Sequence, residues 1–225
     1  MRSNRRTVNA GVFGYGAAQA VRRASIVTRK KNFDTIILSI LVNDDFHRDR
    51  MSFRLGFPRP AVIQSENGLS YADVPPIESR GTKWQPRHIS KILLTVKNHS
   101  ILINKFLEKF DLTGMRRTEI HENAANINQI IEFTTRELSS LDVRKKFIVL
   151  QYSQNDFLSQ TIESQEIRKL IHLESQSRGI QVIDTYDRLQ AEINNSNTRI
   201  WNGHHTAHGN EIVCDEIYQV VQNSK

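Results

Sequence analysis

Three short stretches of the sequence combine residue types and spacings that could do chemistry. Glycine recurs at Gly11, Gly14 and Gly16, and a glycine-rich turn before a helix can present backbone N–H groups to an anion. Asn43-Asp44-Asp45 follows a long apolar run, and WNGHHTAHGNEI (201–212) places three histidines before a C-terminal helical pattern. Carboxylates, amides and imidazoles are common acids, bases and metal ligands, so each stretch is a candidate site.

The first two stretches also have simpler interpretations. The glycine triplet runs in the reverse order of the dinucleotide fingerprint G-x-G-x-x-G, so it predicts no nucleotide site. Asn43-Asp44-Asp45 could bind a cation through its oxygens, but such residues are also common in strand-end turns, where their side chains bond the nearby backbone. We favour the turn, and we expect neither a metal nor another cofactor.

The histidine stretch suggests zinc only at first sight. His204 and His208 stand four residues apart, yet Gly203 and Gly209 bracket them and argue against a helix through both. Thr206 is a better N-cap for a helix that continues toward the C-terminus. We therefore expect one catalytic-type histidine on the loop before that helix, with its two histidine neighbours solvated.

Apolar periodicity predicts the elements that position these stretches. Strands are expected at Thr7–Val12, 34–42, 145–152 and within GIQVIDTY, ending near Asp184. Helices are expected at 17–31, 86–110, 117–141, about 158–177, 185–193 and 209–222. This order predicts an α/β fold, a three-layer α/β/α sandwich with a parallel sheet. The glycine stretch, Asn43-Asp44-Asp45 and Gln154-Asn155-Asp156 each follow a predicted strand, where such sheets gather functional groups.

Residues 44–85 interrupt this alternation with four prolines and three glycines. We interpret them as an ordered, lid-like excursion over one edge of the sheet, because long structureless loops are uncommon in compact domains. The whole chain, 1–225, is expected to form a single domain around this insertion.

Composition and charge limit the class of protein. The net charge is +7, and eight Lys or Arg residues precede the first acid, Asp34. This basic third could bind nucleic acid, but no recognition-helix or stacking-aromatic motif accompanies it, so solvated helix ends are the favoured interpretation. No apolar run approaches the roughly 18 residues of a membrane span, and no signal-peptide pattern is present. The single Cys214 rules out an internal disulfide, and a cytoplasmic location is expected.

Taken together, the three stretches resemble sequence blocks of the SGNH (GDSL-type) hydrolases, a superfamily of serine esterases, lipases and carbohydrate acetyl-esterases. VNAGVFGYG resembles the second block, with Asn9 and Gly14 at its asparagine and oxyanion-hole glycine positions. TIILSILVNDD resembles the third block, with Asn43 as the other oxyanion donor. WNGHHTAHGNEIV resembles the last block, with His204 in the histidine position and Asn202 in the acid position. The resemblance implies an SGNH/flavodoxin-like fold.

The sequence departs from this pattern in two places. The first block, Gly-Asp-Ser, supplies the nucleophile of the family, but only eight residues precede Asn9 and Ser3 among arginines is a poor substitute. The chain is therefore expected to lack its first β-α unit. Asn202 also replaces an acid, and a neutral amide does not stabilise an imidazolium as a carboxylate does.

The resemblance implies hydrolysis of a small-molecule or glycan ester by acyl transfer to serine and then to water. His204 would be the general base, Gly14 and Asn43 the oxyanion donors, and Asn202 the residue that orients the histidine. Because no nucleophilic serine is found, the chain as given is expected to be inactive. Two alternatives stay open: a non-catalytic binding module on a degenerate hydrolase fold, and a nucleic-acid-binding protein. The sequence predicts neither the exact ester, since nothing is recognised in 44–110, nor the oligomeric state.

Overall fold

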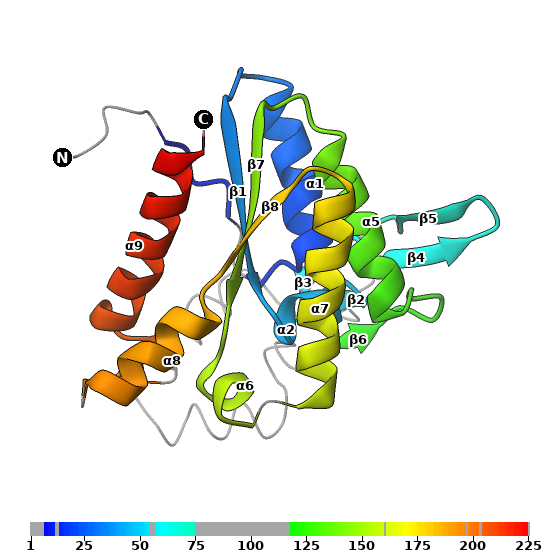
Figure 1. Ribbon diagram of the computed structural model, residues 1–225. Coiled ribbons are helices and arrows are strands. Elements are labelled where there is room, and N and C mark those ends of the chain that lie inside the picture. Colours follow the sequence, from blue (N-terminus) through cyan, green and yellow to red (C-terminus); the bar gives the residue numbers. More distant parts are fainter. Residues whose placement is uncertain are drawn as a thin grey trace, which may run out of the picture. The chain divides into compact units, whose positions relative to one another are not determined.

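The computed structural model (Figure 1) describes residues 7–11, 14–54, 57–74, 118–159, 161–196, 198–202 and 204–224, without the side chains of Arg54, Phe57 and His204. The chain divides into two compact units. The first comprises Met1–Asp49 and Asn126–Lys225, and the second comprises Arg50–Ala125. The helix expected at 86–110 lies outside the described residues.

A parallel sheet of three strands, in the order β1-β7-β8, forms the centre of the first unit. The strands are β1 (Thr35–Leu41), β7 (Lys145–Gln151) and β8 (Gln181–Asp184). The middle strand β7 is buried from Phe147 to Leu150, as its continuous apolar run requires of a strand covered on both faces. The α/β class, the parallel sheet and these three strands are confirmed.

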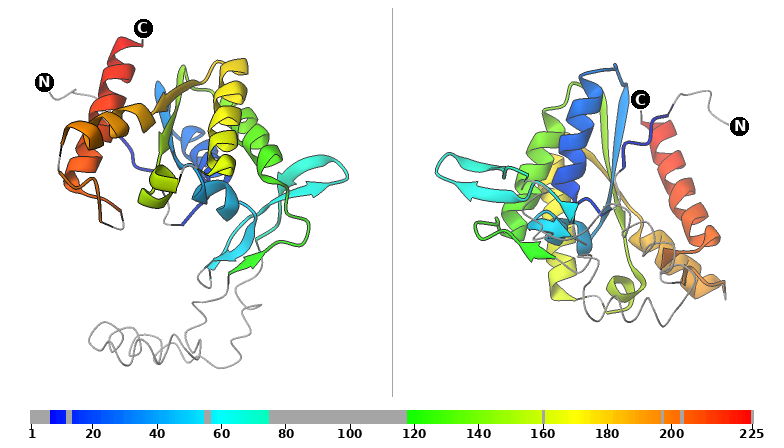
Figure 2. Two further views of the ribbon diagram at one scale, coloured as in Figure 1. Left: turned by 60° about the horizontal axis from the view of Figure 1, so that its bottom comes forward. Right: turned by 180° about the vertical axis from the view of Figure 1, so that it is seen from behind.

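Helices cover both faces of this sheet, an arrangement compatible with an α/β sandwich (Figures 1 and 2). The helices on one face are α1 (Ala17–Thr28), α5 (Ile127–Ser139) and α7 (Ile162–Ser177), and those on the other are α8 (Tyr186–Asn195) and α9 (Ala207–Asn223). Two short helices, α2 (Asp44–Arg48) and α6 (Gln154–Ser159), follow the carboxyl ends of β1 and β7. None of the described helices is long and apolar enough to cross a membrane.

Local sequence signals set the ends of two of these helices. The side chain of Thr206 accepts a hydrogen bond from the backbone N–H of Gly209, which confirms the predicted N-cap of α9. The apolar face of α9 then packs on Phe147 and Val149 of β7. At α5, Asn126 and Gln129 bond each other's backbone N–H in a capping box.

That cap explains one difference from the sequence-based prediction. The helix expected over 117–141 begins only at Ile127, because Asn126 caps it there and Glu119–Ile120 forms the short strand β6. A second difference concerns the strand expected at Thr7–Val12. Residues 7–11 belong to no strand, since the side chain of Asn9 accepts a bond from the N–H of Gly11 in a local turn; Val12 lies outside the described residues.

The second unit is built of short antiparallel strands. Its elements are β2 (Met51–Arg54), β3 (Phe57–Pro58), β4 (Val62–Ser65), β5 (Gly68–Tyr71) and β6, with a sheet in the order β3-β2-β6 and a hairpin β4-β5. Gly68 closes the hairpin with φ of 97°, a conformation that glycine adopts without steric cost. Of the excursion predicted at 44–85, the structure describes 44–54 and 57–74, which contain α2 and the strands β2 to β5.

Candidate functional site

Asn43 lies directly beyond β1, next to the residues that follow β7. Its Nδ2 donates a hydrogen bond of 2.5 Å to Oδ1 of Asp156, and the hydroxyl of Ser153 donates to Oδ2 of the same carboxylate at 2.7 Å. Among the described residues, the buried Oδ1 atom of Asn43 has no hydrogen-bond partner. Asn43, Ser153 and Asp156 therefore form one polar cluster at the carboxyl ends of two neighbouring strands, as expected for an open parallel sheet.

The histidine loop is attached to the same region through Trp201. The loop forms a short hairpin of β9 (Trp201–Asn202) and β10 (His204–His205), in which Asn202 pairs with His204 along the backbone. The indole N–H of Trp201 donates to the carbonyl of Tyr152 at 3.0 Å, and its ring lies 5.1 Å from that of Phe157. Because Phe157 is the neighbour of Asp156, these contacts link the hairpin to the Asn43 cluster. The side chain of His204 lies outside the described part.

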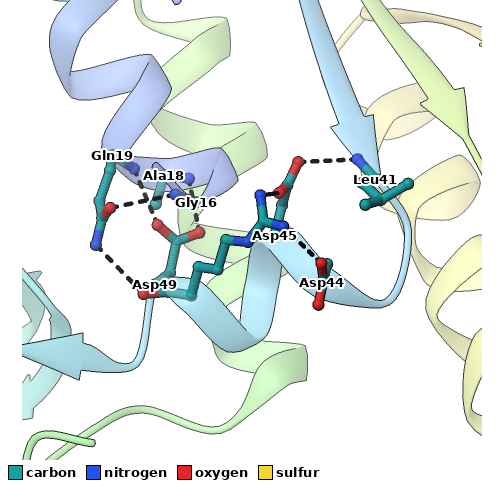
Figure 3. A network of polar contacts seen from close by, with 8 residues as sticks. Gly16, Ala18, Gln19, Leu41, Asp44, Asp45 and Asp49 are labelled. Carbon is teal, nitrogen blue, oxygen red and sulfur yellow. Dashed lines mark hydrogen bonds and ion pairs between the residues drawn. The ribbon is translucent and has the colours of Figure 1, made fainter. Parts of the chain in front are cut away.

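The glycine stretch lies beside the segment that follows Asn43, where Gly16 is close to Asp45 and Asp49 (Figure 3). Gly14 has φ of 75°, in the left-handed region that favours glycine, and Gly16 is the N-cap of α1. A Cβ atom on Gly16 would lie 2.3 Å from Oδ1 of Asp49 and 2.4 Å from the carbonyl oxygen of Asp45. Gly16 is thus required by the close approach of the segment that follows Asn43, rather than by its own backbone angles.

Asp49 supplies the cap that Gly16 cannot. Its two carboxylate oxygens accept hydrogen bonds from the backbone N–H groups of Ala18 and Gln19 at 2.8 and 3.0 Å, in the first turn of α1. The side chain is fully buried, and this burial, assisted by the nearby charge of Asp45, raises its pKa to about 8. The carboxyl group is therefore largely neutral at pH 7.

Asp45 also has a structural role in Figure 3. Its Oδ2 accepts from the backbone N–H of Leu41 at 2.8 Å, and its Oδ1 accepts from the guanidinium of Arg48 at 2.7 Å. Arg48 bonds Asp44 as well, at 2.5 Å. Asp44 and Asp45 thus form the first turn of α2, where Arg48 and the backbone of Leu41 bond their carboxylates. No group of three potential metal ligands occurs among the described residues.

His205 and His208 contact other side chains and are less exposed than the sequence suggested. Nε2 of His208 lies 2.8 Å from Oε1 of Glu192, which joins α9 to α8, and the His208 side chain is only 33% exposed. The hydrogen bond from His208 lowers the pKa of Glu192. The ring of His205 is half-buried and lies 5.8 Å from the ring of Trp201. The expectation that both neighbours of His204 are solvated is wrong, because each packs against another element.

A second polar cluster, which sequence reasoning missed, surrounds Asp184 at the end of β8. Its carboxylate accepts from the hydroxyl of Tyr152 at 2.9 Å and from Nε of Arg168 at 2.5 Å, and lies 3.0 Å from Nε2 of His172. Burial raises the pKa of Asp184, but its hydrogen bonds to His172, the backbone and Arg168 outweigh burial and lower it. The signal in the sequence that could have pointed to Asp184 was its position at the end of a predicted strand. Since its partners satisfy the carboxylate, this cluster connects α7 to the sheet.

The comparisons with known proteins leave the family open. No family model, no curated protein and no solved structure matches this chain. The resemblance to the SGNH hydrolases therefore stays a prediction from the sequence motifs.

Proposed function

We propose that the carboxyl edge of this sheet is the substrate site of an ester hydrolase of the SGNH type. The supporting observation is the series of contacts from Asn43 through Asp156 and Phe157 to Trp201, which attaches the hairpin carrying Asn202 and His204 to the end of β1. Catalytic and oxyanion groups must reach one substrate atom, and groups on one edge of the sheet can do so.

In this proposal Asn43 and Gly14 stabilise the developing oxyanion, His204 is the general base and Asn202 orients it. The Nδ2 group of Asn43 carries two hydrogens, of which Asp156 accepts one, so the second can serve a substrate oxygen. The ester is a small-molecule or glycan ester. The nucleophilic serine is not among these four residues.

Asp156 is the feature that works against oxyanion stabilisation. A carboxylate at 2.5 Å from Nδ2 of Asn43 orients the amide, but it also places negative charge beside the position of the oxyanion. At about 5 Å between charges and an effective dielectric constant of 20–80, this repulsion costs about 1–3 kcal/mol. The same observation favours a second candidate function, a binding module on the same fold without catalysis.

Anion binding tests the oxyanion site without the need for a nucleophile. Methylphosphonate, a small tetrahedral anion, should shift the ¹⁵N resonances of the Asn43 side-chain amide and of the Gly14 N–H with one common Kd. Asn43→Ala should abolish the response, whereas Asn194→Ala, at an exposed position on α8, should leave it unchanged. Resonances that stay in place at both positions would refute the proposed site.

The charge of Asp156 provides a sharper prediction. Asp156→Asn keeps a carbonyl acceptor for Nδ2 of Asn43 and removes the negative charge, so methylphosphonate should bind about tenfold more tightly or better. Unchanged or weaker binding in this variant would contradict the electrostatic argument.

Turnover separates the hydrolase from the binding module. The chain as given should hydrolyse p-nitrophenyl acetate only at the background rate, because none of the assigned residues is a nucleophile. A version extended at its N-terminus by a Gly-Asp-Ser strand and helix should be active, and His204→Ala should remove that activity. An extended protein that binds methylphosphonate but stays inert, even with Asn202→Asp, would favour the binding module.

A further inference from the structure

One edge of the parallel sheet lacks a strand neighbour in the part of the chain that the structure describes. Strand β1 pairs with β7 alone, and the described residues 7–11, which run beside it, form no backbone hydrogen bond with it. Alternate residues of β1 therefore direct their N–H and C=O groups away from the sheet. Such an edge is a template for another extended chain.

A cavity of about 310 Å³ lies along this edge. Thr35–Ser39, five successive residues of β1, line it together with Val8–Gly11. Because successive side chains of a strand point to opposite faces, five adjacent lining residues place the cavity along the backbone edge rather than over one face. The edge is thus bordered by space instead of by packed side chains.

The walls of the cavity suit the apolar side chains of an extended peptide. Ala20, Ala24 and Val27 of α1 line it on one side, and the two alanines leave room that larger residues would fill. On the opposite face of the sheet Ile37 is 43% exposed, although its register partner Phe147 is buried beneath α9. Both faces beside β1 therefore have apolar surface for an additional strand to cover.

The rim of the cavity is positively charged. Arg23 is exposed and stands three residues after Ala20 and four before Val27, so it lies on the same side of α1 as the cavity lining. Lys30 and Lys31 are exposed just beyond the end of α1. An occupant with acidic side chains would complement this charge.

We propose that the open edge of β1 is a docking site for an extended acidic peptide segment, which adds to the sheet as a further strand. The backbone edge provides hydrogen bonds, the α1 wall receives the alternate apolar side chains, and the positive charge near the cavity attracts the net negative charge of the peptide. This inference uses none of the residues assigned to the hydrolase site. Because a strand added to the N-terminus for the turnover test would compete for the same edge, peptide binding is measured with the chain as given.

The probe is an acetylated seven-residue peptide of alternating glutamate and valine, measured by fluorescence anisotropy with the complete chain. Two N-methylated versions, one methylated at the valines and one at the inner glutamates, block the two edges of the peptide in turn. Strand addition uses only one edge, so one version should lose binding and the other keep it. The lysine–valine counterpart should bind at least about tenfold more weakly.

Protein variants and hydrogen exchange locate the binding. Ala24→Phe should fill the cavity and weaken binding about tenfold or more, whereas Ala191→Phe on α8, also half-buried, should not; circular dichroism confirms that both variants fold. The peptide should also slow the exchange of β1 amides. Equal binding of both N-methylated peptides, or no binding up to about 1 mM, would overturn the proposal. A dimer that protects the β1 amides without peptide would also overturn it, since a second copy would then occupy the edge.

Discussion

Replacing Gly16 with alanine tests whether the glycine stretch is built for close packing. The added Cβ would lie 2.3 Å from Oδ1 of Asp49 and 2.4 Å from the backbone oxygen of Asp45. Backbone atoms cannot turn aside as a flexible side chain can, and Asp45 is held by its bond to Leu41. Either α1 or the segment 45–49 must therefore move.

The cost follows from two effects. Overpacking of a fitted site costs about 1–3 kcal/mol. Weakening a hydrogen bond between Asp49 and the first turn of α1 adds about 1–3 kcal/mol, since a buried donor loses its partner. We expect Gly16→Ala to lower the free energy of unfolding by about 2–6 kcal/mol, a large share of the about 5–15 kcal/mol of an ordinary domain.

The other two glycines of the stretch serve as matched controls in urea unfolding followed by circular dichroism. Gly14→Ala should cost about 1–2 kcal/mol, because φ is 75° there and a side chain is strained in that region. Gly11→Ala should cost least, since its Cβ would meet only the exposed side chain of Asn9, at 3.0 Å. A Gly16→Ala variant as stable as wild type, or less affected than Gly14→Ala, would refute this reasoning.

Two further predictions concern buried polar groups. The pKa of Asp49 rises from 3.8 to about 8 on folding, so the folded state binds its proton more tightly, and the stability from this group is complete below pH 4 and lost as the pH rises through 8. Measured by urea unfolding between pH 5 and 8, the free energy of unfolding should fall by up to about 1.4 kcal/mol for each pH unit, and Asp49→Asn should remove this fall. A fall of the same size in the variant would show that Asp49 ionises normally. Trp201→Phe should cost about 1–3 kcal/mol, because the carbonyl of Tyr152 loses its indole donor, and hydrogen exchange should quicken in the hairpin; unchanged exchange would show that Trp201 does not anchor it.

Much of the fold could be predicted because its signals are local. The apolar run of β7 predicted a strand covered on both faces, and the strand is buried from Phe147 to Leu150. The apolar run of β1 predicted the same, but β1 is buried only at Leu38 and Ile40, because it lies at the edge of the described sheet. Thr206 predicted the start of α9, since an N-cap depends only on the residues within one turn. The strand predicted at Thr7–Val12 is wrong because another local signal outweighs it. Its β-branched residues suit a strand, but the side chain of Asn9 makes a local turn instead.

The contacts around the candidate site could not be predicted, because they join distant parts of the chain. Asn43 and Asp156 are separated by 113 positions, and Asp49 accepts from the N–H of Ala18, 31 positions before it, to cap α1. No local pattern pairs a carboxylate with one helix terminus among several. The sequence could identify Asn43 and Gly16 as candidates. That Asp156 bonds Asn43 and that Asp49 lies against Gly16 could be learned only from the tertiary structure.

Those acids also decide what the edge of the sheet can bind. Four carboxyl groups lie beside the segments of Gly16 and Asn43, and three of them have a cationic partner or a proton. Asp44 and Asp45 share the guanidinium of Arg48, and Asp49 is largely protonated at pH 7 because burial raises its pKa to about 8. Asp156 has no cationic partner among its hydrogen bonds in the described structure, which are to Asn43 and Ser153. Its charge therefore sets the balance between an edge that stabilises an oxyanion and one that repels it.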